Sequence, residues 1–565
     1  MRVNIIGSFG KMTGVAQDVS ILHGLIAHVL GKETEIRHVK HFHPECLPAD
    51  INFFVEVVNP SLLIYAGRNI WIPNPEWTYR TWEPYVKMMD EIWVKTRSAI
   101  QPFESAGGNV KYIGWTSIDK QFSIDRKDYS TALVPIGKNL WRNPKPIVQA
   151  YMRIRATDPA LYARLPKVVM VYRIPLPILP ESLNDKFTIY AGPDPLSDDQ
   201  YNELVATCGL TLCISGAEGF GHSVNEAMSS GSLLLINPIA PFCELTDKAY
   251  WASTSKSIQH PTCFGPLEDT EVASIVDALK VYVDTSVDDK CEQSKYMRQQ
   301  YEDRHETFVK TMQERIGSLS VSVPYSLEDR LPKEAELPCV SVITLTRDRR
   351  VFLPLARYCM VAQSYPESKI EWVIVDDGKD QIKDLVSDIP NVNYVLVDEP
   401  MTIGAKRNLA VSRASYNIVV VMDDDDVYPN NSILSRVTHL MMEPAKQCLF
   451  STVIPCYDIH ETKSFMNVPP ITLPMSQRVS EATLCFTRDF WLERPFPDDQ
   501  IGEGDAFIHG REQMCREISP QDVIVSLTHK KTTSARKAPP GESNGCHYGF
   551  SDELFTLVSE IAARI

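Results

Sequence analysis

The strongest constraint on the fold of this chain is the alternation of short apolar runs with amphipathic segments of helix length. Such alternation is typical of parallel sheets layered with helices. In the N-terminal part, strands are expected at residues 3–7, 52–58, 61–66, 91–95 and 110–113, and then at 133–136, 167–172, 187–191, 210–215 and 233–237. The pattern therefore predicts an α/β protein that begins with two Rossmann-like halves.

A polar segment rich in proline separates these halves from a second series of expected strands, at residues 339–345, 372–376, 392–397 and 418–422. Residues 318–337 show no periodicity and are the best candidate for a linker. The predicted organisation is a module at 1–317, a linker at 318–337 and a module at 338–565. The first module divides into halves at about 1–130 and about 131–290, with a closing helix at 291–317.

The charge balance excludes several classes of partner. Lys and Arg number 57 against 72 Asp and Glu, a net charge of −15, so the chain is a poor general binder of nucleic acid or anionic membrane. No apolar stretch of about 18 residues occurs, so no integral membrane segment is expected. The first residues lack the features of a signal peptide, and the 13 cysteines form no C-x-x-C pair. We therefore expect reduced thiols and a cytoplasmic location. The oligomeric state is not predicted.

The sharpest motif of the first module follows the expected strand at 210–215. A glycine-rich turn precedes a helix that begins near His222, and such a turn presents backbone N–H groups and a positive helix end to a phosphate. Glu226 lies about one helical turn in, where its carboxylate can accept both ribose hydroxyls. Glu218, in the turn, can face a transferred sugar.

The spacing Glu218-x7-Glu226 resembles the donor motif of family-four glycosyltransferases, because Gly-Phe-Gly follows the first Glu and Ala-Met-x-x-Gly the second. Residues 137–143 and 196–204 also resemble segments of that family. The resemblance implies a retaining enzyme with two facing Rossmann domains, the GT-B fold, and no metal. It assigns Glu218 to catalysis and donor binding to Gly7, Gly10, Lys138, Arg142, Lys145, Gly219, Phe220, Gly221 and Glu226. Arg142 would hold the donor diphosphate.

The second module carries four consecutive aspartates, Asp423–Asp426, at the end of the apolar run 418–422. Adjacent carboxylates at the end of a buried strand repel one another unless a cation lies between them. Hard divalent ions prefer oxygen ligands and can bridge such carboxylates to a diphosphate. Asp377 ends another expected strand, where it could accept from a nucleobase or ribose, and Lys406 or Arg407 could contact base or phosphate.

These blocks, in this order, resemble family-two glycosyltransferases of the GT-A fold, which are inverting and metal-dependent, over nearly all of residues 339–540. The resemblance assigns Asp423 to the ribose and Asp425 to Mn²⁺ or Mg²⁺, with His529 able to complete the metal shell. Asp426 is a second ligand or a structural cap. Donor contacts are also expected from Thr344, Arg347, Asp377, Lys406 and Arg407. The general base is Asp505, with Glu503 as its rival because Gly504 separates the pair.

Three functions are consistent with these motifs. The leading one is a bifunctional glycosyltransferase that moves sugars from UDP-, GDP- or dTDP-linked donors to a growing oligosaccharide or glycoconjugate. In the second, only the GT-A module is catalytic and the GT-B module binds acceptor or donor. It is favoured by the rearranged basic pair and by the absence of a His from residues 72–77, in the expected acceptor loop. The third, a non-enzymatic nucleotide-sugar sensor, would need no base. A polymerase or helicase is excluded by the charge and by the absence of G-x-x-x-x-G-K-[ST].

Overall fold

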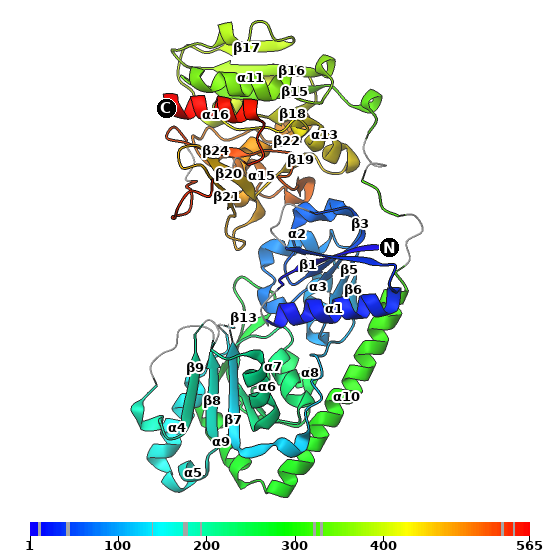
Figure 1. Ribbon diagram of the computed structural model, residues 1–565, viewed down its shortest axis with the longest axis vertical. Helices are drawn as coiled ribbons and strands as arrows, with labels where there is room; N and C mark the ends of the chain where they lie inside the picture. Colours follow the sequence, from blue (N-terminus) through cyan, green and yellow to red (C-terminus); the bar gives the residue numbers. More distant parts are fainter. Residues whose placement is uncertain are drawn as a thin grey trace. The chain divides into compact units, whose positions relative to one another are not determined.

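The computed structural model describes residues 1–9, 13–40, 46–137, 139, 141–172, 179–192, 195–319, 324–327, 332–532, 536–545 and 548–565. The chain divides into two compact units, of which unit 1 ends at Pro324 and unit 2 continues from Tyr325 to Ile565 (Figure 1). The short segment Asn59–Ala66 groups with unit 2. Both units are mixed α/β with parallel strand pairs, so the expected fold class is confirmed at this level.

The first sheet of unit 1 has the strand order β2-β1-β3-β4-β5-β6. Its strands are β1 (Arg2–Gly7), β2 (Glu35–Lys40), β3 (Ala49–Val55), β4 (Ala66–Ile72), β5 (Glu91–Val94) and β6 (Val110–Tyr112), and its helices are α1 (Gly14–Leu30), α2 (Glu83–Val86) and α3 (Ile100–Ser105). Strand β1 pairs in parallel with β2 and β3, and β5 pairs in parallel with β4 and β6. All seven residues of β3 are buried, as expected of a central strand covered on both faces.

The strand expected at residues 61–66 is wrong. The chain forms a 3₁₀ helix there, Pro60–Tyr65, and the strand β4 begins only at Ala66. Pro60 is preset for the first helical position, and the Asn59 side chain accepts a hydrogen bond from the backbone N–H of Ser61 at 3.1 Å. The apolar run is therefore capped as a helical turn, although its composition favours a strand.

The second sheet of unit 1 has the order β12-β11-β10-β7-β8-β9. Its strands are β7 (Asp128–Gly137), β8 (Lys167–Tyr172), β9 (Phe187–Ala191), β10 (Cys208–Cys213), β11 (Leu233–Ile236) and β12 (Tyr250–Trp251). Its helices are α4 (Lys145–Thr157), α5 (Pro159–Arg164), α6 (Asp198–Thr207), α7 (His222–Ser229), α8 (Ala240–Leu245) and α9 (Val272–Asp284). The hairpin of β13 (Thr254–Gln259) and β14 (Pro266–Thr270) follows β12.

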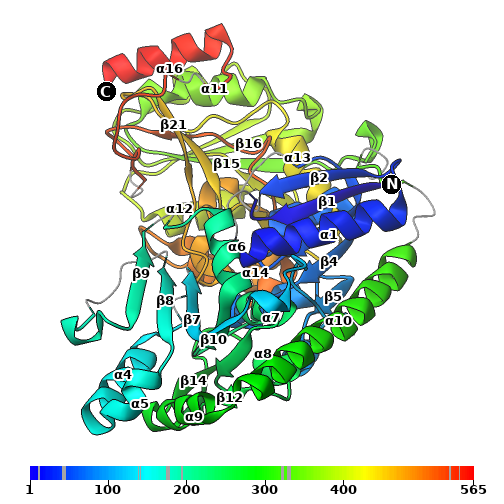
Figure 2. The same cartoon turned by 60° about the horizontal axis from the view of Figure 1, so that its bottom comes forward.

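One long helix, α10 (Val287–Gly317), joins the two halves of unit 1. It begins at Ser286, whose side chain accepts from the backbone N–H of Asp289 at 3.1 Å. Its buried side chains recur at helical spacing along one stripe: Lys290, Ser294, Met297, Tyr301, Phe308, Met312 and Ile316. Through this stripe α10 packs against α1 of the first half and α7 of the second, and Figure 2 shows it running past both.

Unit 2 is built on a mixed sheet of order β17-β16-β15-β18-β22-β19-β23 and a small sheet of order β21-β20-β24. The strands are β15 (Val340–Thr346), β16 (Ile370–Asp376), β17 (Val392–Leu396), β18 (Ile418–Val421), β19 (Cys448–Phe450), β20 (Ile454–Asp458), β21 (Lys463–Asn467), β22 (Cys485–Thr487), β23 (Cys515–Glu517) and β24 (Ser526–Thr528). The helices are α11 (Leu353–Val361), α12 (Ile403–Arg413), α13 (Ser432–Met442), α14 (Arg488–Glu493), α15 (Glu503–Ile508) and α16 (Asp552–Arg564). Strands β15–β18 pair in parallel, so their carboxyl ends share one edge of the sheet.

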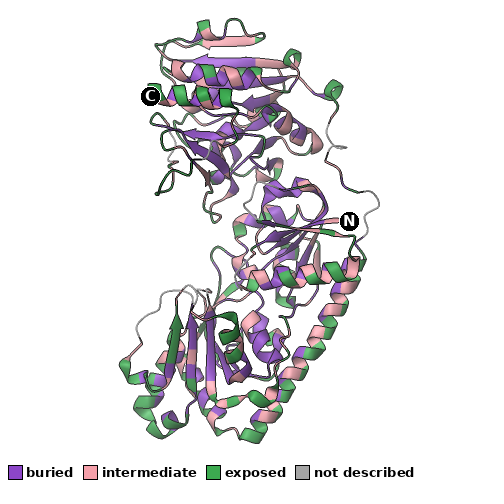
Figure 3. Ribbon diagram, viewed as in Figure 1, coloured by how far each residue is buried: buried purple, intermediate pink, exposed green. Residues whose placement is uncertain are grey.

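Burial follows these layers (Figure 3), in which the central strands of the sheets are purple. The exposed faces of α4, α5 and α16 are largely green. Among the described helices, none is both long enough and apolar enough to cross a bilayer. Each unit thus buries its own core and leaves polar loops at the carboxyl ends of its strands.

Candidate active sites

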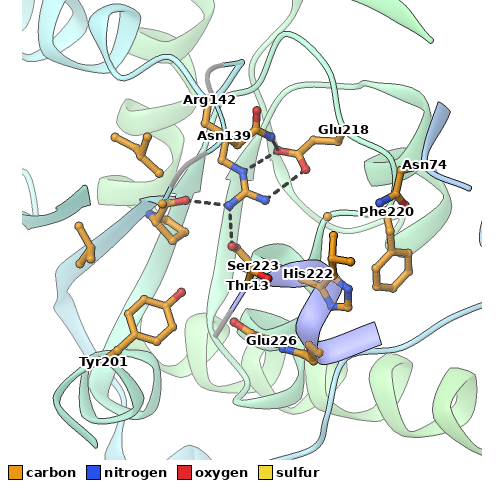
Figure 4. A pocket seen from close by; sticks show the side chains of 18 of the residues that line it. Thr13, Asn74, Asn139, Arg142, Tyr201, Glu218, Phe220, His222, Ser223 and Glu226 are labelled. Carbon is orange, nitrogen blue, oxygen red and sulfur yellow. Dashed lines mark hydrogen bonds and ion pairs between the residues drawn. The ribbon is translucent and has the colours of Figure 1, made fainter. Parts of the chain in front are cut away.

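Unit 1 contains a cavity of about 370 Å³ lined from both halves of the unit. Its walls come from the start of α1, the segment after β4, the loop after β7, helix α6, and the turn that leads into α7. Side chains that line it include Thr13, Gln17, Glu56, Asn74, Glu76, Lys120, Asn139, Arg142, Tyr201, Glu218, His222, Ser223 and Glu226. Residues from both halves of unit 1 therefore surround the predicted donor motif in this cavity (Figure 4).

The turn before α7 is shaped by glycine. Gly221 is the N-cap of α7 with φ of 89°, a left-handed conformation that side chains rarely adopt, and a Cβ there would approach the ring of Phe242. No side chain among the described residues caps α7, so none of them accepts from the first backbone N–H groups of this eight-residue helix. Such a terminus favours an anionic ligand.

Arg142 and Glu218 form a two-pronged ion pair at one wall of the cavity. The guanidinium Nε lies 2.6 Å from Glu218 Oε1 and Nη2 lies 3.1 Å from Oε2. Its Nη1 donates to Ser223 Oγ at 2.7 Å and to the carbonyl of Pro135 at 3.0 Å, as Figure 4 shows. Burial disfavours the charge of Arg142, but the facing Glu218 carboxylate raises its pKa further above the ordinary value. The predicted cation and the predicted catalytic carboxylate are thus direct neighbours.

Glu226 lies deeper, and its Oε1 accepts a hydrogen bond at 2.7 Å from Gln17 of α1. The Gln17 side chain in turn accepts from the backbone N–H of Ile118 at 3.0 Å. A carboxylate that is only 8% exposed, hydrogen-bonded on one side and open to a cavity, is suited to accept from a diol. Gln17 comes from the first half of unit 1, so both halves position this group.

A buried polar network that the sequence analysis missed supports the same wall. Asp18 forms an ion pair with Lys95, and its Oδ1 lies 2.9 Å from His222 Nε2, the first residue of α7. Lys95 also donates to Asn74 Oδ1 at 3.0 Å, and the Asn74 amide donates to Glu56 Oε2 at 2.6 Å. Burial opposes the charge of Asp18, but Lys95 and His222 outweigh it and lower its pKa. The network fixes the start of α7 against α1.

Three predicted residues of unit 1 do not line the cavity. A Cβ at Gly7 would lie 2.9 Å from Val19 Cγ2, so this glycine permits close packing of β1 against α1. Lys145 is exposed in the first turn of α4, where its backbone N–H is held by Asn143. Gly219 lies beside the cavity instead, against Glu76. Gly10 and Lys138 are outside the described residues. The basic residues that do line the cavity are Arg142 and Lys120.

In unit 2 the acidic run follows β18 and meets residues of three other segments. His529 Nε2 lies 3.1 Å from Asp425 Oδ2, and Arg349 Nη1 lies 3.1 Å from Asp424 Oδ1 and also pairs with Asp425. The side chains of Asp423 and Asp425 are 32% and 14% exposed, whereas that of Asp424 is 1% exposed. The outer pair of the triplet is therefore the more accessible to a ligand.

Asp426 has a structural role. Its Oδ1 accepts from Ser526 Oγ at 2.8 Å and from the backbone N–H of Leu527 at 2.9 Å, which ties the acidic run to β24. It lies outside any helix start, since α13 begins at Ser432. Burial, followed by repulsion from Asp425, raises the pKa of Asp426 to about 7. Asp426 therefore does not cap α13, and its Oδ1 is bound to β24.

Among the described side chains, no group of three His, Cys, Asp or Glu residues is arranged as a finished metal site. The donor chemistry nevertheless fits a divalent cation, because Asp425 and His529 adjoin one another and Asp423 follows the same strand. Burial and the neighbouring Asp425 carboxylate raise the pKa of Asp424 to about 7. The single positive charge of Arg349 therefore does not balance the negative charge of the carboxylates around it. The sequence analysis missed Arg349.

The residues expected to hold the nucleotide lie next to this cluster. Asp377 Oδ2 accepts from the backbone N–H of Met401 at 2.8 Å, and its Oδ1 pairs with buried Lys406. Arg407 Nε donates to Glu503 Oε1 at 2.9 Å, and its Nη1 lies 4.0 Å from Asp423 Oδ1. Arg407 therefore links the acidic run to the start of α15, where the predicted base residues are found.

The two candidates for the base differ in their surroundings. Glu503 is buried and bound to Arg407, whereas Asp505 is half-buried and its Oδ1 has no hydrogen-bond partner among the described residues. A third carboxylate, Glu481, accepts from the backbone N–H of Gly504 at 3.2 Å, and burial and Glu503 raise its pKa. Asp505 is therefore more available than Glu503 to accept the proton of an acceptor hydroxyl.

Two expected donor contacts of unit 2 lie apart from the acidic run. Thr344 Oγ1 donates to the carbonyl of Met422 at 2.7 Å and accepts from Trp372 Nε1 at 2.8 Å, so its hydroxyl is hydrogen-bonded within the core. Arg347 is exposed, and no ion pair joins it to another of the described residues. Asp348 has φ of 53°, and after this left-handed turn it is Arg349 that reaches the acidic run.

Comparison with known proteins identifies the class of unit 2. Residues 341–499 match the model of the family described as Glycosyl transferase family 2. Unit 2 therefore contains a segment that matches a glycosyltransferase family, and the expected enzyme class, glycosyltransferase, is confirmed. No curated protein sequence matches the chain significantly.

Three solved structures are similar to parts of this chain. TarS 1–349 of S. aureus is 16% identical with a TM-score of 0.27, and the match covers 34% of this chain and 60% of that one. The mannosyltransferase PcManGT of Pyrobaculum calidifontis, in complex with GDP-Man and Mn²⁺, is 21% identical with a TM-score of 0.29 and coverage of 35% and 60%. Alr3699/HepE of Anabaena, in complex with UDP and glucose, is 12% identical with a TM-score of 0.38 and coverage of 56% and 98%. The chain thus spans about 60% of the first structures that it matches.

Proposed function

We propose that the chain is a bifunctional glycosyltransferase with one nucleotide-sugar site in each unit. Unit 1 would be a retaining module of the GT-B fold, and unit 2 an inverting module of the GT-A fold. Both would act on UDP-, GDP- or dTDP-linked donors and build an oligosaccharide or glycoconjugate. The observation that carries the proposal for two sites is the cavity of unit 1, where Arg142, Glu218 and Glu226 meet. A cytoplasmic location agrees with the free thiols of the described cysteines.

In unit 1 the protein itself would stabilise the leaving diphosphate. Arg142 and the uncapped start of α7 supply positive charge at one end of the cavity, and Glu226 offers a carboxylate to the ribose. Glu218 would face the transferred sugar once a diphosphate competes for Arg142. No metal is needed in this arrangement, in line with the family-four resemblance.

In unit 2, Asp425, His529 and Asp423 would hold Mn²⁺ or Mg²⁺, which when bound supplies charge neutralisation for a diphosphate leaving group. Asp377 and Lys406 would bind the nucleotide, and Arg407 would orient Asp423 and Glu503. Asp505 would take the proton of the acceptor hydroxyl. The glycosyltransferase family model over residues 341–499 supports this site.

One observation favours the alternative in which unit 1 only binds a sugar. All three guanidinium nitrogens of Arg142 are already occupied by Glu218, Ser223 and Pro135. A diphosphate must break this pair before it can be neutralised, which would weaken donor turnover. Under this alternative, unit 1 holds the acceptor glycan for unit 2.

Nucleotide release from a panel of UDP-, GDP- and dTDP-sugars tests the proposal, with and without an added glycan acceptor, in Mn²⁺ or in EDTA. The variants are Asp425→Ala for unit 2 and Glu226→Ala for unit 1, with the exposed acids Glu560→Ala and Glu104→Ala as matched controls. Two active sites predict one donor that depends on Asp425 and metal and another that depends only on Glu226. If Asp425→Ala abolishes all release and Glu226→Ala changes none, unit 1 is a binding module.

A further inference from the structure

Glu76 is the most unusual side chain of the unit 1 cavity. It lies in the 3₁₀ turn Pro75–Trp77 that follows β4, lines the cavity, and is only 5% exposed. Its Oε2 has no hydrogen-bond partner among the described residues. A buried carboxyl oxygen without a partner costs free energy, so its retention calls for a ligand that satisfies it.

The position of Glu76 is fixed by its backbone rather than by its side chain. The carbonyl of Pro75 accepts from the N–H of Gly265 at 3.2 Å, and the carbonyl of Thr78 accepts from the N–H of Phe264 at 3.0 Å. These bonds anchor the turn to the β13–β14 hairpin of the other half. The backbone that carries the carboxyl group is therefore held beside the cavity.

The carboxyl group lies directly beside the donor motif. A Cβ built on Gly219 would be 2.7 Å from Glu76 Oε1 and 2.8 Å from Asn74 Cβ, distances too short for real atoms. Gly219 immediately follows Glu218, so Glu76 occupies the space that a side chain in this turn would fill. The absence of a side chain at residue 219 is thus what admits Glu76.

The charges around Glu76 favour its neutral form. Burial raises its pKa to about 8, and the carboxylates of Glu218 and Glu56 add to the rise, against the weaker influence of Lys95. Cys263, on the hairpin, is the other titratable group facing it, and burial raises the pKa of that thiol. A protonated carboxyl donates from one oxygen and accepts at the other, which is the pattern that a sugar hydroxyl complements.

We propose that Glu76 is a specificity-determining residue that binds hydroxyl groups of the donor sugar in the unit 1 cavity. The inference rests on the proposed donor site of unit 1 and names the side chain that distinguishes one sugar from another there. A hydroxyl that matches both oxygens of Glu76 gains two hydrogen bonds, whereas a sugar lacking it leaves them unsatisfied.

Calorimetric titration of the full chain tests the proposal, in EDTA and with Asp425→Ala in place to silence unit 2. The probes are UDP-glucose, UDP-N-acetylglucosamine and GDP-mannose, each beside its free nucleoside diphosphate. The variants are Glu76→Ala, the conservative Glu76→Gln and Gly219→Ala, whose Cβ displaces the carboxyl. Glu104→Ala, an exposed acid on α3, is the matched control.

We expect one nucleotide sugar to bind more tightly than its free diphosphate. Glu76→Ala should remove about tenfold of that affinity while the diphosphate binds as before, Gly219→Ala should also weaken binding of the sugar, and Glu76→Gln should keep most of it. The proposal is overturned if Glu76→Ala weakens sugar and diphosphate equally, if it weakens neither, or if no sugar adds to the affinity. Absence of any nucleotide binding by unit 1 would instead overturn the donor site itself.

Discussion

Replacing Glu76 with Gln should abolish a pH dependence of stability that the buried carboxyl imposes on unit 1. Because the folded-state pKa is raised from 4.5 to about 8, the folded chain holds a proton that the unfolded chain has already lost between these pH values. The free energy of unfolding therefore falls as pH rises through this window. At roughly 1.4 kcal/mol per pH unit, the full loss by pH 8 is about 5 kcal/mol, an upper value because the buried site can relax.

Differential scanning calorimetry of the full-length chain and Glu76→Gln at pH 5 to 8.5 measures this effect. At pH 5 both side chains are neutral and similar in shape, so the two proteins should melt together. By pH 8.5 the variant should melt higher by up to about 7 °C, given the size of unit 1. Other groups titrate in both proteins and cancel in the difference, and Glu104→Gln provides the control. A difference in melting temperature that is constant with pH, or that falls as pH rises, would refute the assigned protonation.

Two further predictions follow from contacts described above. Asp505→Asn should lower kcat of the metal-dependent reaction by about 100-fold or more, with little change in donor KM. Glu503→Gln should mainly raise donor KM, because it frees Arg407. The opposite pattern in steady-state kinetics would exchange the roles of the two residues. Lys95→Met should destabilise unit 1 by about 3 kcal/mol because Asp18 loses a buried partner, and adding Asp18→Leu should restore part of it. Equal and additive losses in chemical denaturation would show that the pair is not coupled.

Local sequence patterns were sufficient to predict the groups that follow buried strands. The acidic run after Met422 and the glycine turn around Glu218 lie where strand-then-turn patterns put them, because parallel strands end at a common edge. The family model over residues 341–499 independently covers the first of these regions, the acidic run. The same pattern predicts a donor contact from Arg347, whereas Arg349 is the residue that faces the acidic run. The left-handed backbone at Asp348 decides this direction, and a sequence does not display it.

Residues that act through long-range neighbours had no such local pattern. Asp18, Lys95 and Asn74 are far apart in the sequence, and only folding brings them together with His222. Glu76 lies in the polar turn after β4, which the sequence displays, but no local pattern indicates that its side chain is buried. Burial of a polar residue is decided by what packs over it, here the hairpin of the other half.

The contacts of α10 with both halves of unit 1 affect the order in which the chain can fold during synthesis. Tyr301 donates to the carbonyl of Ser117 at 2.6 Å, Phe308 packs on Trp115, and Arg298 joins Asp119 to the end of α7. The first sheet is complete once residue 112 has been made, yet its helix α1 remains partly uncovered until α10 arrives. The ribosome must therefore synthesise about 200 more residues before α10 covers the apolar face of α1. This takes roughly 10–40 s at ordinary elongation rates. A chain that ends before α10 would therefore leave this face of α1 without the helix that covers it.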